Sequence, residues 1–186
     1  MHVLKYKPED IQLYIFADDV LNRWLTSFCL LDADTFAGLD KFENVFISRL
    51  PLGSDHDADD DPTATKFKWE QGHLNGAAFK CEELAQYFTG EVGTCITKAD
   101  LTQTGTTSEK RESIIFGTAS GGIHALHPLA TREEIDFFTH LEMYLRIESQ
   151  PLCGRDHVTF RSMYVPQKDV IDGDLCSMFP NLPPNK

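Results

Sequence analysis

The period of the apolar residues changes once along this chain, near residue 130. Before that point apolar and polar residues alternate over short segments, as at Ile11, Leu13 and Ile15, which is the two-residue period of a β-strand. After it, apolar residues recur every three or four positions between Ile135 and Leu145, which is the period of an α-helix. Short strands followed by helices predict a mainly β chain with a helical C-terminal segment.

Seven further segments before residue 130 are predicted strands, each bounded by turn residues. They cover residues 23–31, 35–41, 45–50, 79–88, 95–101, 113–118 and 123–128. We expect the first of them to be buried on both faces, because Trp24, Phe28 and Leu30 alternate with Leu25 and Cys29. Residues 42–44 and 120–122 are predicted hairpin turns.

Two helices are predicted after the change of period. Thr131 and Glu134 form the Thr-x-x-Glu pattern of a capping box, so the first helix begins there. The second begins at Asp172 and ends before Pro180. We expect it to turn Leu175, Met178 and Phe179 inward. The chain therefore divides into a β region, residues 1–128, and a helical segment, residues 129–186.

Two stretches of the β region are predicted to be exposed connections. Residues 51–65 carry five aspartates with Gly53 and Pro62, and such a charge block is normally solvated. Its alternating aspartates resemble the start of a calcium loop, but the glycine and glutamate that such a loop needs further on are missing. Residues 102–112 are polar and are predicted to form a hairpin tip.

The charge balance excludes some functions. The chain carries 29 acidic and 17 basic residues, a formal net charge of −12. A domain that binds nucleic acid normally needs a basic patch, so we expect basic protein partners and only indirect contact with RNA. The five cysteines are odd in number and form no CxxC pair, which favours a reducing compartment. No apolar run predicts a membrane span or a signal peptide, and no cofactor is expected.

Four groups of residues contain side chains that occur in catalytic, metal or phosphate sites. Cys153 and His157 could be a thiol nucleophile and its base. His124 and His127 form HxxH, but on a strand two residues three apart point to opposite faces, so no metal site is expected. Asp172 and Asp174 suit a helix cap better than paired catalytic carboxylates. The glycine-rich stretch 117–122 matches a hairpin turn rather than a phosphate-binding loop. No catalytic residues are predicted.

Several longer motifs identify a family. They are LLDADTFAGLDKFENVFISRLP (30–51), DDDPT (59–63), GHLNGA (72–77), TASGGI (118–123), DFFTHLEMYLR (136–146), PLCGRDHVTFRS (151–162), VIDGDLC (170–176) and PNK (184–186). With them the chain resembles the C-terminal region of the large three-propeller subunit of splicing factor 3b. That family belongs to a superfamily with the large subunits of the cleavage and polyadenylation specificity factor and of the damaged-DNA-binding complex. Residues 102–112 are longer and more polar than the family pattern, and the helical tail that usually follows PNK is missing.

The resemblance implies a fold and a function. The fold is the last blades of a seven-bladed, WD40-like β-propeller, an incomplete ring, with C-terminal helices. The function is that of a non-catalytic scaffold in the U2 snRNP that supports pre-mRNA splicing in the nucleus. The implied partners are the other splicing factor 3b subunits, the helical-repeat subunit and the small subunit. Two alternatives are a polyadenylation factor or ubiquitin-ligase adaptor of the same superfamily, and a hydrolase that uses Cys153 and His157.

Two sets of residues are candidates for specific roles within this reading. Contacts with partners are expected from the exposed members of residues 21–41 and 93–115. The candidates are Arg23, Trp24, Asp40 and Lys41, although Trp24 could equally be core. A second set is expected to hold the terminal helices on the propeller through charge-assisted hydrogen bonds. Its members are Arg155, Asp156, Arg161, Asp172 and Asp174.

Overall fold

The computed structural model describes residues 1–54, 69–70, 72, 76–100, 112–149, 151 and 154–182. The acidic residues 55–65, the tip residues 101–111 and Cys153 lie outside this part. The described strands are β1 (His2–Lys7), β2 (Gln12–Asp18), β3 (Leu25–Leu30), β4 (Thr35–Asp40), β5 (Asn44–Arg49), β6 (Phe79–Lys80), β7 (Glu82–Phe88), β8 (Gly93–Asp100), β9 (Glu112–Thr118) and β10 (Ile123–Leu126). The helices are α3 (Arg132–Glu148), α4 (His157–Arg161), α5 (Gly173–Cys176) and the short 3-10 helix η1 (Phe179–Asn181). The chain is mainly β with helices at its C-terminal end, as predicted.

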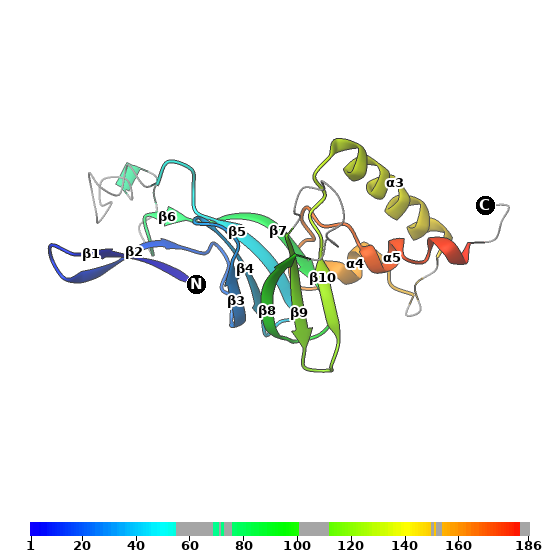
Figure 1. Cartoon of the computed structure of the whole chain (residues 1–186), viewed down its shortest axis with the longest axis horizontal. Coiled ribbons are helices and arrows are strands. Elements are labelled where there is room, and N and C mark those ends of the chain that lie inside the picture. The colour runs from blue at the N-terminus through cyan, green and yellow to red at the C-terminus, as the bar shows by residue number, and fades with distance from the viewer. Residues whose placement is uncertain are drawn as a thin grey trace.

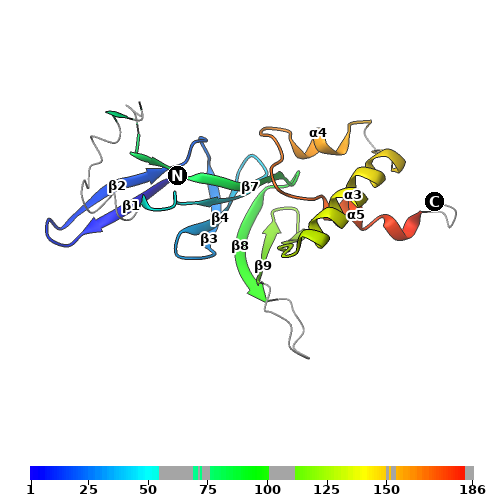
Figure 2. The same ribbon diagram turned by 90° about the horizontal axis from the view of Figure 1, so that it is seen from above.

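The strands form three sheets in the described part of the chain. The central sheet has the order β3-β4-β5-β7, all antiparallel, which is the build of one propeller blade. The second sheet, β8-β9-β10, is also antiparallel. The third joins the hairpin β1-β2 to β6, which pairs parallel to β2. These are parts of a propeller, and the described sheets do not close into a ring (Figures 1 and 2).

Two apolar clusters cover the two faces of the central sheet. On one face Phe36 and Phe46 pack with Phe16 and Phe79 of the third sheet. On the other face Leu39, Val45 and Tyr87 pack with Phe116 of the second sheet. Consecutive side chains of a strand point to opposite faces, so Val45 and Phe46 enter different clusters. Gly38 lies under Phe46, and a Cβ atom there would be 2.5 Å from the Cζ atom of that ring.

One strand departs from its expected burial. The prediction that residues 23–31 are buried on both faces is wrong. Leu25 packs into the core, whereas Trp24, Phe28 and Leu30 are 63%, 59% and 67% exposed. Alternating apolar residues on both faces indicate a buried strand only when both faces have a neighbour. Phe28 and Leu30 pair with Gly38 and Phe36, so they lie on the face that carries Phe36 and Phe46, but within the described residues that apolar cluster does not extend over them.

The hairpin β1-β2 carries an apolar row that nothing covers in the described structure. Leu4 pairs with Ile15, and Tyr6 pairs with Leu13, and all four side chains are more than half exposed. We call these four residues the hairpin row. The hairpin extends from one end of the molecule and the helices occupy the other end (Figures 1 and 2).

The helical end begins as predicted. The Thr131 hydroxyl accepts a hydrogen bond from the Glu134 amide at 3.2 Å, and the Glu134 carboxylate accepts one from the Thr131 amide at 3.2 Å. This capping box opens α3. The second predicted helix is shorter than expected. Leu175 is buried, but Met178 and Phe179 are 42% and 57% exposed, so their predicted inward packing is wrong.

Candidate functional site

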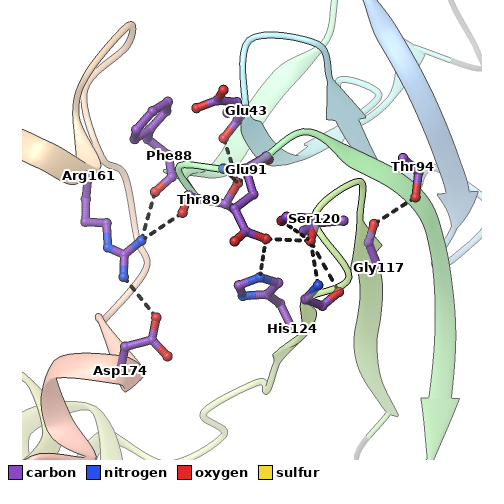
Figure 3. A network of polar contacts seen from close by, with 12 residues as sticks. Glu43, Phe88, Thr89, Glu91, Thr94, Gly117, Ser120, His124, Arg161 and Asp174 are labelled. Carbon is purple, nitrogen blue, oxygen red and sulfur yellow. Dashed lines mark hydrogen bonds and ion pairs between the residues drawn. The ribbon is translucent and has the colours of Figure 1, made fainter.

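The guanidinium of Arg161 joins the helical end to the central sheet. Arg161 is the last residue of α4, and its side chain is 11% exposed. Its Nε donates to Asp172 Oδ2 at 2.8 Å and its Nη2 to Asp174 Oδ2 at 2.9 Å. Its Nη1 donates to the carbonyl oxygens of Phe88 and Thr89 at 3.3 and 3.2 Å. One side chain thus binds the start of α5 and the end of β7 (Figure 3). We call Arg161, Asp172 and Asp174 the Arg161 cluster.

Asp172 is the second centre of this cluster. It is 3% exposed, and its carboxylate caps α5 by accepting from the Leu175 amide at 3.2 Å. Its own backbone amide donates to the Glu142 carboxylate on α3 at 2.8 Å. Burial raises the pKa of Asp172, but hydrogen bonds and charge from Arg161 outweigh it, so the pKa is lowered overall. The carboxylate is therefore held in its charged form.

This lowered pKa predicts a dependence of stability on acid. The carboxylate stabilises the fold fully above the pKa of an unfolded aspartate, about 3.9, and this contribution is lost as the pH falls through the lower folded pKa. We expect the stability of the parent chain to fall more steeply below about pH 4 than that of Asp172→Asn. Urea unfolding midpoints between pH 3 and pH 6 measure this. Asp136→Asn, at an exposed pair with Arg132, is the control, and parallel curves for Asp172→Asn and the parent would contradict the prediction.

The other two residues of this predicted set lie apart from the cluster. Asp156 caps α4 through the Thr159 amide at 3.4 Å. It also accepts from Arg146 of α3 at 3.0 Å, so it connects two helices. Arg155 donates only a weak contact to the Met163 sulfur at 3.6 Å. The structure therefore brings Arg161, Asp172 and Asp174 together and leaves Arg155 outside.

The four predicted partner-contact residues separate by burial. The Arg23 side chain is 2% exposed and pairs with Asp19 and Glu83, and Asp40 is 3% exposed. Arg23 is thus paired inside the fold, and the Asp40 carboxylate accepts from the amide groups of Phe42 and Asn44. Trp24 is 63% exposed and is not core. The Lys41 ammonium lies 3.3 Å from the centre of its ring, so these two residues remain the accessible pair.

A second polar network joins the β7–β8 connection, which contains Glu91, to the turn between β9 and β10. Glu91 accepts from the Thr118 hydroxyl, and its carboxylate lies 3.6 Å from His124 Nε2 (Figure 3). Hydrogen bonds from Ser120 and Thr118 lower the pKa of Glu91. The sequence does not single out Glu91, because nothing in its local pattern distinguishes it from a surface acid. The predicted turn at residues 120–122 contains Gly121, which has a φ of 92°.

In the part of the chain that the structure describes, the candidate chemical groups are not assembled into one centre. His124 faces Glu91, whereas His127 Nδ1 lies 2.7 Å from the Ser113 hydroxyl. Within the described residues no group of three His, Cys, Asp or Glu side chains could hold a metal ion. His157 Nε2 lies 3.3 Å from the Ser149 carbonyl, and Cys153 is outside the described part. No helix in the described ranges is long and apolar enough to span a bilayer.

The chain has antiparallel, blade-like sheets joined to a helical segment. These features define its class of protein, which is an incomplete β-propeller with a helical end. The chain belongs to the family described as CPSF A subunit region, which it matches over residues 1–181. It is 52% identical over 98% of its length to spliceosome-associated protein 130 A of Arabidopsis thaliana. It is 48% identical over 98% to splicing factor 3B subunit 3 of Danio rerio, and 40% identical over 96% to pre-mRNA-splicing factor prp12 of Schizosaccharomyces pombe. The chain spans 15%, 15% and 14% of the lengths of these relatives.

Proposed function

We propose that the chain is a non-catalytic scaffold region of the splicing factor 3b complex in the U2 snRNP and supports pre-mRNA splicing in the nucleus. The observation that carries this proposal is the 40–52% identity over nearly the whole chain to proteins named as splicing factors. The net charge of −12 supports protein partners, with contact to RNA only indirect.

Each part of the chain has its own place in this proposal. Residues 1–128 supply the blades of the platform, and residues 129–186 supply the helical segment held by the Arg161 cluster. The partners are the helical-repeat subunit and the small subunit of splicing factor 3b, with no membrane contact. Of the four candidate residues, Trp24 and Lys41 are the accessible ones, because they are exposed and are not part of the core.

Affinity purification of the tagged chain from nuclear extract tests this function. We expect the other splicing factor 3b subunits to co-purify and to decrease with Trp24→Ala, while Trp69→Ala, at a tryptophan that is 79% exposed elsewhere, leaves them unchanged. Recovery of a cullin or of polyadenylation factors in their place would assign the chain to another complex of the superfamily. A thiol-reactive probe that labels Cys153 and loses this reaction in His157→Ala would favour the hydrolase.

A further inference from the structure

A small groove lies at the corner where the β2–β3 connection, the β4–β5 turn and the segment after α4 meet. Its volume is about 240 Å³, and its lining includes Arg23, Asp40, Phe42, Asn44 and Tyr164. We call it the corner groove. Pockets for drug-sized ligands and cofactors are typically about 300–1,000 Å³. The corner groove therefore fits one side chain of a partner better than a cofactor.

Among the described residues, one residue that lines the groove has an oxygen without a hydrogen-bond partner, and another has a carboxylate without a cation. The Asp40 carboxylate accepts only neutral amide donors, from the backbone of Phe42 and from the backbone and side chain of Asn44. None of its described contacts is with a cation. The Asn44 side chain donates its NH₂ to both Asp40 oxygens, at 3.1 Å each, so its Oδ1 must point elsewhere. That Oδ1 has no hydrogen-bond partner among the described residues.

One cation, Arg23, lines the groove, but its guanidinium is already paired with residues of the fold. Arg23 donates to Asp19 at 2.8 Å and to Gln86 at 2.9 Å, and it also pairs with Glu83. Its guanidinium carbon lies 3.8 Å from the centre of the Phe46 ring. Asp19 and Glu83 balance the charge of Arg23, and the Lys41 ammonium lies over Trp24, 5.5 Å from the centre of the Phe42 ring. Asp40 is therefore the lining carboxylate that has no cation among its described contacts. A donor that completes it must come from another molecule and should be positively charged.

The walls of the groove are aromatic and accessible. The rings of Phe42 and Tyr164 are 5.8 Å apart at an angle of 55°, and the two residues are 39% and 63% exposed. A planar guanidinium stacks on such rings and donates from its edges, whereas an ammonium is a compact, strongly hydrated charge. The Asp40 carboxylate would repel a phosphate, which disfavours a nucleic-acid backbone.

We propose that the corner groove binds an arginine side chain of a partner protein. The aliphatic stem and the guanidinium lie against Phe42 and Tyr164, and the N–H groups face Asp40 and Asn44. This inference does not rest on the proposed membership of splicing factor 3b, because any basic partner segment with an accessible arginine would satisfy it. Arginine is among the residues enriched at protein interfaces.

Labelled pentapeptides that differ only at the central residue test the proposal on the 186-residue chain. Fluorescence anisotropy would compare Gly-Ser-Arg-Ser-Gly with peptides that carry lysine, leucine or tryptophan at the centre. We expect the arginine peptide to bind at least tenfold tighter than the leucine peptide and several-fold tighter than the lysine peptide. Equal or tighter binding of the leucine or tryptophan peptide would show an apolar site and overturn the proposal. Equal binding of the lysine peptide would overturn the assignment to arginine, and no binding of any peptide would overturn the site.

Substitutions at Tyr164 test whether the peptide binds in the corner groove. Tyr164→Phe keeps the ring and is expected to stay within twofold of the parent, whereas Tyr164→Leu is expected to weaken the arginine peptide at least fivefold. Tyr6→Ala, at an exposed tyrosine of the hairpin row, is the matched control and is expected to leave binding unchanged. If gel filtration shows that the chain self-associates and that Tyr164→Leu abolishes this, a second copy occupies the groove and the proposal is wrong. The peptide comparison needs no variant, so it decides the matter even if Tyr164→Leu does not fold.

Discussion

Arg161→Ala is expected to lower the free energy of unfolding by about 3–5 kcal/mol, the usual effect of removing one member of a buried ion pair. The substitution leaves Asp172, 3% exposed, charged and without its cation. It also removes the donors to the carbonyl oxygens at the end of β7 and the stacking of the guanidinium carbon 4.6 Å from the centre of the Tyr87 ring. The loss should therefore appear in the attachment of α4 and α5 to the central sheet.

Urea unfolding of the chain measures this effect, and hydrogen exchange locates it in residues 157–176. Arg155→Ala is the matched control, because Arg155 donates only to the Met163 sulfur and surface substitutions normally stay within about 0.5 kcal/mol. Arg161→Lys keeps the charge but not the forked geometry, so it should fall between the two. An unchanged melting temperature of Arg161→Ala, in this chain or in a full-length relative, would refute a holding role for the cluster.

Arg23→Ala is expected to destabilise the fold by a similar amount, about 3–5 kcal/mol, rather than to act mainly on a partner. The side chains of Arg23 and Asp19 are 2% and 4% exposed, so the substitution leaves a buried carboxylate without its cation. It also uncovers the ring of Phe46, which is 1% exposed in the core. Arg23 is thus a packing residue of the central sheet.

A double-mutant cycle separates the buried charge from the lost packing. Asp19→Ala added to Arg23→Ala removes the unpaired carboxylate and should recover part of the loss, with a coupling energy of about 0.5–3 kcal/mol. Lys41→Ala is the control for a cation on the surface, where contact with an aromatic ring contributes about 0.5–1 kcal/mol. Calorimetry of the parent, the two single variants and the double variant gives the coupling energy, and Lys41→Ala is measured beside them. Additive effects of the two substitutions would show that the pair does not determine stability here.

The sequence predicts the positions of the strands and helices better than it predicts which surfaces pack against them. The β4–β5 hairpin, the β9–β10 hairpin and the capping box of α3 follow from local periodicity and turn chemistry, and the structure confirms them. The exposure of Phe28 and Leu30 did not follow, because the pattern of a strand does not say whether a second sheet lies against it. Met178 and Phe179 show the same limit, since apolar residues just after a helix of one turn need not face the core.

The candidate site was predictable only in part for a related reason. Arg161, Asp172 and Asp174 lie within motifs that the family resemblance identified, so their importance was visible before their contacts. The pairing of Arg23 with Glu83 joins residues sixty positions apart, and periodicity carries no information about such long-range contacts. The corner groove likewise needs three separate segments to meet, so it becomes visible only in the folded chain.

The exposed hairpin row affects the expected steady-state level of this protein in a cell. Exposed sheet faces of this kind promote aggregation and engage chaperones and proteases. The level of soluble chain should therefore rise and fall with the supply of whichever surface shields Leu4, Tyr6, Leu13 and Ile15, so that excess copies made without it are degraded.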